Sequence, residues 1–234
     1  MRAVIVDDEL HARAELESLL AETGAFDVVG RCADAVAALQ AIRRERPDVV
    51  FLDIQMPAIS GFELLSMLED HELPEVVFVT AHDEFALRAF EESAVDYLLK
   101  PVSRERLAKT VERLHKRAAP RDRSGYPRAP IRRIPCLAGP SIRLVDLPEV
   151  EFVRSSEAGV YVLSAKGELF TELTLKVLEE RAGLVRCHKQ YLVNIDRVDE
   201  VKLEDGAATL RTRSGKDVPV SRRFLAKVRE RLEI

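Results

Sequence analysis

The first half of the chain repeats one pattern five times: a short apolar segment followed by an amphipathic one. Apolar runs of this length predict strands buried on both faces, and helices between them predict a parallel sheet covered on both sides. We therefore expect a five-stranded, doubly wound α/β domain over residues 1–118. The expected strands are 3–8, 26–32, 48–53, 75–81 and 94–100, and the expected helices are 12–22, 34–45 with Asp34 as N-cap, 60–70, 83–93 and 103–118.

The pattern changes after residue 118. Residues 119–130, "APRDRSGYPRAP", hold three prolines and a glycine and have no hydrophobic period, which predicts a linker. Short alternating runs follow, such as "SIRLVD" and "GVYVLSAK", separated by Gly, Pro or Ser. Alternation of this kind is typical of antiparallel strands with one buried face. We expect a mostly antiparallel β domain over residues 131–234, with helices at 174–182 and 221–234.

Charge divides along the same line. Residues 1–118 hold 14 basic and 23 acidic residues, whereas residues 119–234 hold 22 basic and 17 acidic ones. A basic second half is compatible with a polyanionic partner, although many domains without such a partner carry as large an excess. At 234 residues, the chain has the length of two ordinary domains.

Several classes of protein do not fit the composition. No apolar segment approaches the ~18 residues that a membrane span needs, so we expect no membrane insertion. The N-terminus becomes acidic at Asp7, which is unlike a secretory signal. Cys32, Cys136 and Cys187 have no CxxC spacing and cannot all pair, which favours reduced, buried thiols. We therefore expect a cytoplasmic protein.

The expected strands of the first domain end in polar residues. Four apolar residues at 49–52 run directly into a carboxylate, and burying an unpaired carboxylate is costly. In an open parallel sheet, the carboxyl ends of the strands meet at one edge, where ligands bind. The residues that we expect there are Asp7 and Asp8 after the first strand, Asp53 after the third, Thr80 at the end of the fourth and Lys100 after the fifth.

Three carboxylates at one edge repel one another unless a cation lies among them, and clustered oxygen ligands suit Mg²⁺. An Asp held in such a cluster can act as a nucleophile and form an aspartyl-phosphate. Phosphoryl transfer mainly needs positioning and charge neutralisation, which Lys100 and Mg²⁺ would supply, with a hydrogen bond from Thr80. Singly, each residue has an ordinary structural explanation, as a turn residue, a surface turn or core filler. Together they indicate a phosphoryl-transfer site.

Residues 1–118 resemble the receiver domain of two-component response regulators, a flavodoxin-like fold. The segments that carry the resemblance are "VDDE" (6–9), "LDIQMPAISG" (52–61), "VTA" (79–81) and "DYLLKP" (96–101). The resemblance implies that a sensor histidine kinase phosphorylates Asp53. It also implies that Asp8, Asp53 and the backbone carbonyl of Gln55 ligate Mg²⁺, that Asp7 orients a water of the metal, and that the Lys100–Pro101 bond is cis.

The same resemblance implies a switch. Tyr97 stands three residues before Lys100, where the family has its switch aromatic, although a half-buried strand tyrosine is the alternative. Phosphate on Asp53 would draw Thr80 towards it and allow Tyr97 to turn inward, which is a two-state element biased by a local charge. The family commonly dimerises over the surface that corresponds to 84–116, so we predict a homodimer on phosphorylation. Charged residues expected there include Glu91, Glu92, Arg104 and Arg113.

Two basic segments mark the β domain: "RCHKQYLVNIDRV" (186–198) and "VPVSRRF" (218–224). On a nucleic-acid-binding domain, Arg and Lys neutralise phosphates and some basic residues reach base edges. A solvated basic strand end is the alternative, and His188 alone could be structural. The candidate DNA-binding residues are Arg186, His188, Lys189, Ser221, Arg222 and Arg223.

Residues from about 131 to the C-terminus resemble the LytTR output domain of LytR/AlgR-type regulators, chiefly through "CHKQYLVN" and "VSRRF". The resemblance implies an all-β domain that inserts loops into the major groove of double-stranded promoter DNA, at paired direct repeats. Lys189 and Arg222 lie in segments that the family uses for DNA contact. So does the loop "SSEAG" (155–159), which has no basic residue here, in contrast to some relatives.

Two other functions are compatible with parts of the sequence. Phosphatases of the haloacid-dehalogenase class also have an Asp nucleophile after a buried strand, but they need a second acid two residues later, where this chain has Gln55. The β domain could instead bind a protein, which its basic segments disfavour. We therefore expect a phosphorylation-switched transcription regulator, not an enzyme.

Overall fold

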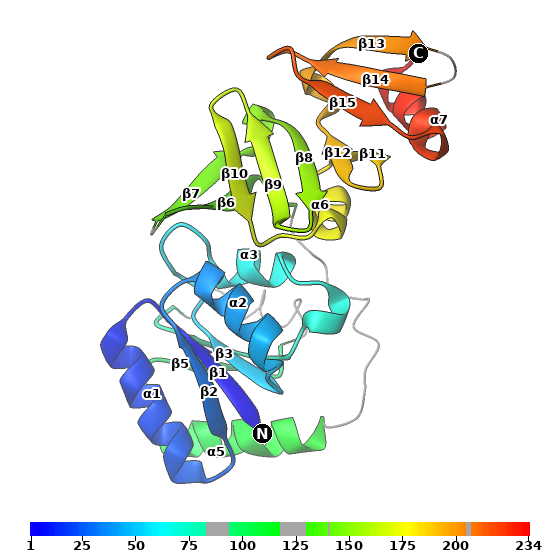
Figure 1. Cartoon of the computed structure of the whole chain (residues 1–234). Helices are drawn as coiled ribbons and strands as arrows, with labels where there is room; N and C mark the ends of the chain where they lie inside the picture. The colour runs from blue at the N-terminus through cyan, green and yellow to red at the C-terminus, as the bar shows by residue number, and fades with distance from the viewer. Residues whose placement is uncertain (83–93, 118–129, 140, 205–206) are drawn as a thin grey trace. The chain divides into compact units, whose positions relative to one another are not determined.

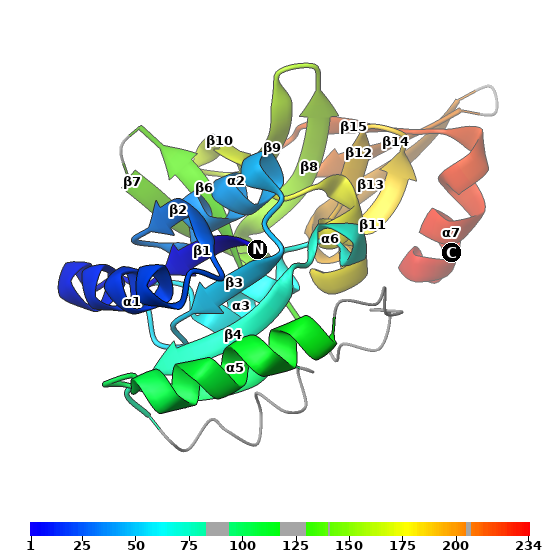
Figure 2. The ribbon, with the colours of Figure 1, turned by 90° about the horizontal axis from the view of Figure 1, so that it is seen from below.

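The computed structural model describes residues 1–82, 94–117, 130–139, 141–204 and 207–234. The chain divides into two compact units, Met1–Ala129 and Pro130–Ile234, which are drawn in Figures 1 and 2. The predicted helix 83–93 lies outside the described residues, as does nearly all of the predicted linker 119–130. The division 1–118, 119–130 and 131–234 therefore stays a prediction.

The first unit is a five-stranded parallel sheet in the order β2-β1-β3-β4-β5. Helices α1 and α5 cover one face, and α2 and α3 cover the other (Figure 1). This confirms the predicted doubly wound α/β fold. The strands are β1 (Arg2–Val6), β2 (Asp27–Cys32), β3 (Val49–Leu52), β4 (Glu75–Thr80) and β5 (Asp96–Leu99), and the helices are α1 (Leu10–Thr23), α2 (Ala35–Glu45), α3 (Gly61–Ser66), the 3₁₀ helix η1 (Asp70–Glu72) and α5 (Arg104–Lys116).

Both faces of the sheet are buried because successive strand residues point to opposite sides. Ile5, Phe51 and Val77 belong to the core under α1 and α5, and Val4 and Val50, one position away, are equally buried. The continuous apolar runs of the sequence follow from this double coverage.

Two helix ends show how local sequence sets the elements. Asp34 caps α2 as predicted, because its carboxylate accepts hydrogen bonds from the Val36 and Ala37 amides at 2.9 and 2.8 Å. Helix α3 is shorter than the predicted 60–70. Its end tightens to hydrogen bonds three residues apart, since the Met67 amide donates to the Leu64 carbonyl at 3.0 Å.

The second unit consists of antiparallel strands in two sheets, which confirms the predicted mostly antiparallel domain. The larger sheet has the order β11-β12-β8-β9-β10-β6-β7, and the smaller has the order β13-β14-β15. Its elements are β6 (Arg133–Ala138), β7 (Ser141–Asp146), η2 (Leu147–Glu149), β8 (Val150–Ser156), β9 (Gly159–Ser164), β10 (Gly167–Thr171), α6 (Leu175–Arg181), β11 (Val185–His188), β12 (Tyr191–Val193), η3 (Ile195–Arg197), β13 (Val198–Glu204), β14 (Ala207–Thr212), β15 (Asp217–Val220) and α7 (Arg222–Leu232).

A shared core joins the two sheets. Cys187 of the larger sheet, Leu210 of the smaller one and Val228 of α7 belong to one buried apolar cluster. A polar link adds to it: the buried Glu151 carboxylate accepts a hydrogen bond from the Thr212 hydroxyl at 2.9 Å. Within the described residues, none of the helices combines the length and apolar character that crossing a bilayer requires.

Candidate functional site

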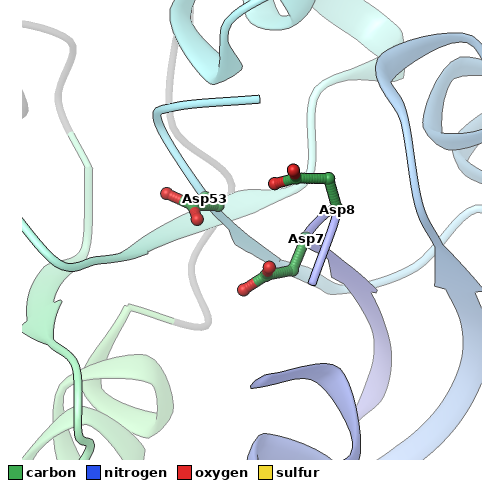
Figure 3. A group of neighbouring side chains, drawn as sticks. All are labelled: Asp7, Asp8 and Asp53. Atoms are coloured by element: carbon green, nitrogen blue, oxygen red, sulfur yellow. The ribbon is translucent and has the colours of Figure 1, made fainter. Parts of the chain in front are cut away.

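Three carboxylates gather at the carboxyl edge of the parallel sheet (Figure 3). Asp7 and Asp8 directly follow β1, and Asp53 directly follows β3. One carboxylate oxygen from each lies within 4.8 Å of the others, with Asp7 and Asp53 buried and Asp8 exposed. The structure thus brings together the three acids that the strand ends of the sequence indicated.

Lys100 is the cation of this cluster. Its ammonium lies 2.7 Å from one oxygen of Asp7 and 2.7 Å from one oxygen of Asp53. Burial alone would lower the pKa of Lys100, but the hydrogen bonds to the two carboxylates outweigh it and raise the pKa. Burial raises the pKa of Asp7 in spite of its bond to Lys100. One ammonium against three carboxylates leaves an excess of negative charge that a further cation would neutralise.

The backbone holds the two buried acids in place. The Glu9 amide donates to the Asp7 carboxylate at 2.9 Å, and the Gln55 amide donates to the Asp53 carboxylate at 3.2 Å. Gly61 is a site residue that the sequence analysis missed: a Cβ there would lie 2.3 Å from the Asp53 carbonyl oxygen. The signal was present, because this glycine closes the "LDIQMPAISG" segment.

Thr80 completes the edge. It is the last residue of β4, it is fully buried, and its hydroxyl has no hydrogen-bond partner among the described residues. A buried polar group without a partner is unusual and asks for an explanation. The Lys100 amide donates to the Thr80 carbonyl at 2.9 Å, and the Lys100–Pro101 bond is cis. Tyr97 is half-buried on β5, and its hydroxyl donates to the His82 carbonyl.

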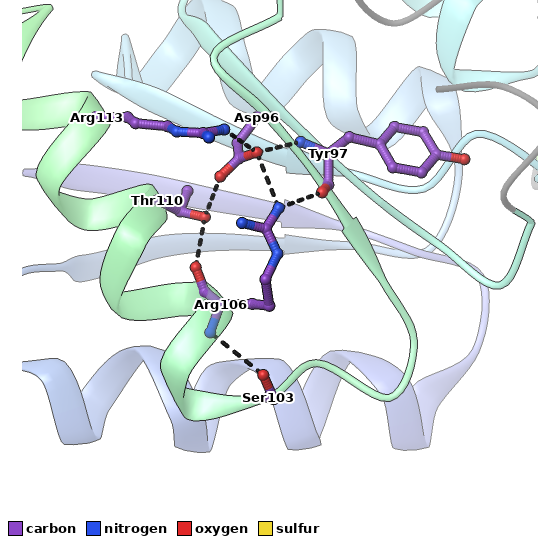
Figure 4. Close-up of polar contacts among 6 residues, drawn as sticks. All are labelled: Asp96, Tyr97, Ser103, Arg106, Thr110 and Arg113. Carbon is purple, nitrogen blue, oxygen red and sulfur yellow. Dashed lines mark hydrogen bonds and ion pairs between the residues drawn. The ribbon is translucent and has the colours of Figure 1, made fainter. Parts of the chain in front are cut away.

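A second buried acid lies on the other side of β5 from the Tyr97 ring (Figure 4). The Asp96 carboxylate accepts a hydrogen bond from the Thr110 hydroxyl at 2.7 Å. It also forms ion pairs with two arginines of α5, Arg106 and Arg113. One of them, Arg106, also donates to the Tyr97 carbonyl at 3.0 Å. The sequence analysis missed this cluster, although Arg106, Thr110 and Arg113 have the spacing that puts residues on one helix face.

This cluster bears on the predicted dimer surface. Arg113 is exposed, as expected, and its guanidinium also pairs with Asp96 of the same chain at 2.5 Å. Arg104 likewise pairs with Glu22 at 2.8 Å. Glu91 and Glu92, the other charged residues expected on this surface, lie outside the described residues.

In the second unit, three separate segments converge. The Ser221 amide, just before α7, donates to the Cys187 carbonyl at 2.9 Å. The Ser155 amide, in the β8–β9 hairpin, donates to the Gln190 carbonyl at 2.8 Å. The turn between β11 and β12 is thereby joined to both other segments that the sequence marked for DNA contact.

The candidate DNA-binding residues differ in their surroundings. Lys189, Arg222 and Arg223 are exposed, and Arg223 covers the Phe224 ring at 4.5 Å. His188 is half-buried, and its Nδ1 accepts a hydrogen bond from the Gln190 amide at 3.2 Å, so this histidine shapes the turn. The remaining candidate arginine, Arg186, pairs with Glu179 at 2.8 Å.

Comparison with known proteins identifies both units. Residues 3–112 match the response regulator receiver domain, and residues 140–233 match the LytTr DNA-binding domain. An "Uncharacterized response regulatory protein" of Vibrio cholerae is 52% identical over 99% of this chain and 98% of its own length. The "Transcriptional regulatory protein BtsR" of Escherichia coli K12 is 48% identical over 98% of each chain.

The chain therefore belongs to the response regulators that combine a receiver domain with a LytTR DNA-binding domain. It is a transcriptional regulator of a two-component system, and the prediction that it is not an enzyme is confirmed by this membership. A receiver domain implies a histidine kinase as partner, and a LytTR domain implies DNA.

Proposed function

We propose that a sensor histidine kinase phosphorylates Asp53, that the phosphorylated chain forms a homodimer, and that the dimer binds double-stranded promoter DNA in the cytoplasm. The observation that carries the phosphorylation step is the buried Thr80 hydroxyl, which has no partner among the described residues and ends the strand beside Asp53 and Lys100. A phosphoryl oxygen on Asp53 would give this hydroxyl the acceptor that it lacks.

The chemistry follows from the cluster. An Asp53 carboxylate oxygen attacks the phosphorus, and the bond from phosphorus to the kinase histidine nitrogen breaks. Lys100 already lies 2.7 Å from Asp53 and would pair with the incoming charge. Asp8, Asp53 and the Gln55 carbonyl would hold Mg²⁺ and Asp7 would orient one of its waters, since three carboxylates within 4.8 Å offer the hard oxygen atoms that this ion prefers. Such an ion would supply positive charge to offset that of the incoming phosphoryl group.

The switch is proposed on Thr80 and Tyr97. Drawing the Thr80 side chain towards Asp53 would empty space beside β5, and Tyr97 would turn into it. The turn requires the hydrogen bond from the Tyr97 hydroxyl to the His82 carbonyl to break. The dimer surface would then include β5 and α5. Arg104 and Arg113 already have partners in the same chain, so their participation would need an exchange of partners.

DNA binding is proposed on the converging segments of the second unit. Lys189, Arg222 and Arg223 would contact phosphates or bases, with Ser221 and His188 beside them. Support comes from the hydrogen bond between Ser221 and Cys187, which puts two basic segments side by side although they are far apart in sequence. Dimerisation would tighten binding to paired half-sites by avidity, without a contact between phosphate and DNA.

The test is a selection from sheared genomic DNA. Full-length protein is incubated with Mg²⁺, with and without beryllofluoride as phosphoryl mimic, and the retained fragments are sequenced. We expect enrichment of a repeated motif that strengthens with beryllofluoride, and Asp53→Asn should retain the weaker enrichment in both conditions. Equal enrichment for the unmodified chain in both conditions would contradict the switch, and absence of enrichment would contradict DNA binding.

A further inference from the structure

Glu179 of α6 connects two segments of the proposed DNA interface. Its carboxylate accepts a hydrogen bond from Arg186 Nε of β11 at 2.8 Å through one oxygen. The other oxygen accepts one from Lys227 Nζ of α7 at 2.8 Å. Helix α7 begins with Arg222 and Arg223, so one acid bonds to the strand before the basic turn and to the helix that carries the other basic residues.

Arg186 extends this connection into the turn. Its Nε donates to Glu179, and its Nη1 donates to the backbone carbonyl of Lys189 at 3.2 Å. The guanidinium therefore spans from α6 to the turn residue whose side chain is exposed. The Arg186 and Glu179 side chains are only 16% and 26% exposed, so both lie mostly beneath the surface that DNA would reach.

We infer that Arg186 is a positioning residue of the DNA interface, not a DNA contact: held by Glu179, it fixes the Lys189–Gln190 turn from behind. This inference rests on the proposed DNA-binding function and refines its site. Arg186 was a candidate contact by sequence because it is basic and adjoins His188 and Lys189. Its bonds to Glu179 and to the Lys189 carbonyl indicate instead that it positions those neighbours.

Charge and geometry both favour this role. Burial alone would raise the pKa of Glu179, but the hydrogen bonds from Lys227 and Arg186 outweigh it and lower the pKa, so the acid is ionised at neutral pH. Turning Arg186 out to a phosphate would leave that acid with only half of its partners. A lysine at position 186 could not replace the planar fork, which makes bonds in two directions at once.

The salt dependence of DNA binding distinguishes a residue that contacts a DNA phosphate from one that only positions its neighbours. Each phosphate contact contributes about 0.9 to the slope of log affinity against log salt concentration, and a residue that touches no phosphate contributes nothing. We propose titrations of full-length protein with beryllofluoride, over a salt series, on the strongest fragment of the genomic selection and on a scrambled version of it. The variants are Arg186→Lys, Arg186→Ala, Glu179→Gln and Lys189→Ala.

We expect Arg186→Lys and Arg186→Ala to weaken binding to the selected fragment by about tenfold, with an unchanged salt slope. Glu179→Gln should have the same kind of effect but a smaller one, since the amide oxygen can still accept a hydrogen bond. The preference for the selected over the scrambled fragment should fall in all three. Lys189→Ala should lower the slope by about 0.9.

Glu149→Gln is the matched control. Glu149 ends η2 and pairs with Lys166 at 2.6 Å; it directly precedes β8, whose other end forms the hairpin that joins the turn. The Glu149→Gln variant should leave unchanged the affinity for the selected fragment, the salt slope and the preference for the selected over the scrambled fragment. Affinities are expressed per folded molecule from the thermal melt of each variant. If the Arg186–Glu179 pair only stabilised the fold, its removal would lower the melting temperature but leave affinity, salt slope and preference as in the unmodified chain. That result would overturn the inference.

Two other results would also decide the matter. A slope lowered by about 0.9 in Arg186→Ala and restored in Arg186→Lys would make Arg186 a phosphate contact and overturn the inference alone. If Lys189→Ala changed neither the salt slope nor the affinity, the proposed DNA site itself would be contradicted. If Arg186→Ala does not fold, Glu179→Gln and Arg186→Lys carry the same test.

Discussion

The two sites of this molecule differ in whether their charged side chains are buried and paired or exposed to solvent. At the edge of the parallel sheet, Asp7, Asp53 and Lys100 are drawn together within hydrogen-bond distance and largely removed from water. In the second unit, Lys189 and Arg222 are exposed and form no ion pair with the residues that the structure describes. A half-buried cation of that unit, Arg186, is already paired with Glu179.

The difference matches the size of the proposed partners. A phosphoryl group is small and must be met from several sides, which requires charges that are buried, close together and held by a rigid backbone. A DNA duplex presents a row of phosphates, which exposed cations on separate loops can reach. A buried site should therefore lose function in large steps on mutation, whereas an exposed site should lose it in small ones.

Lys100→Ala should have the largest effect. Removing the ammonium takes away the positive charge beside Asp53, and we expect the rate of phosphorylation by a small phosphodonor to fall roughly a hundredfold. The rate is measured with Mg²⁺ by phosphate-affinity electrophoresis. Lys109→Ala, at an exposed position of α5, is the control and should be silent. A loss of less than about threefold would contradict the role of Lys100 and weaken the contrast between the sites.

Gly61→Ala tests the rigidity of the buried site. Its Cβ would lie 2.3 Å from the Asp53 carbonyl oxygen, and backbone cannot yield as a side chain can. We expect the free energy of unfolding to fall by about 2 kcal/mol, together with slower phosphorylation. Gly30→Ala is the matched control: its Cβ would meet only side chains, Val4 at 3.1 Å and Ala41 at 3.6 Å. Urea unfolding compares the two, and equal losses would contradict the steric argument.

Arg222→Ala tests the exposed site. As a single phosphate contact among several, it should weaken DNA binding by about tenfold and lower the salt slope by about 0.9, without any change in phosphorylation. Arg229→Ala, at an exposed position further along the same helix, serves as control. If Arg222→Ala abolished binding at every salt concentration, the exposed site would behave like the buried one and the contrast would fail.

The sequence indicated the arrangement of the buried residues at the sheet edge more fully than that of the basic segments, for a physical reason. Parallel strands end at a common edge, so the positions of Asp7, Asp53, Thr80 and Lys100 followed from the order of strands alone. The pairing of Arg186 with Glu179 depends on how α6 is placed against the larger sheet, which no local pattern encodes. Sequence therefore marked Arg186 as basic but could not indicate its partner.

The same reasoning explains the other differences in the fold. The split of the β domain into sheets of seven and three strands depends on long-range pairing, which alternation does not specify. Asp96 looked like an ordinary strand residue, because the three side chains that bond to its carboxylate come from α5. The convergence of Ser155, Gln190 and Ser221 likewise rests on backbone bonds between distant segments.

A smaller effect is expected for the stability of the first unit at acid pH. Burial alone would raise the pKa of Glu72, but hydrogen bonds from Arg43 and the Glu69 amide lower it below the ordinary value of 4.5. A lowered pKa contributes stability that is complete above pH 4.5 and is lost as the pH falls through the folded-state value. Glu72→Gln should remove this dependence and lower stability by less than about 1 kcal/mol at neutral pH.

The measurement is the thermal midpoint of the first unit between pH 3 and pH 7, for the unmodified chain and Glu72→Gln. Glu69→Gln is a useful comparison, since its amide is the second donor to Glu72 and the substitution leaves that amide in place. If Glu72→Gln had the same pH dependence as the unmodified chain below pH 4.5, this pair would have no part in acid stability.

The smallest effect is expected at the cysteines, one in the first unit and two in the second. All three are buried free thiols, and burial raises the pKa of Cys32 to about 11 and those of Cys136 and Cys187 to about 12. At pH 8 the thiolate form would make up roughly 10⁻³ to 10⁻⁴ of each cysteine. Iodoacetamide should therefore leave the native protein unmodified over hours but label all three cysteines in urea. Cys187 makes this a test of the exposed site, since it lies between Arg186 and His188 with its side chain in the core. Rapid native labelling of Cys187 alone, read by mass spectrometry of peptides, would mean that the basic turn opens locally, and the turn would then lack the rigid support from Arg186.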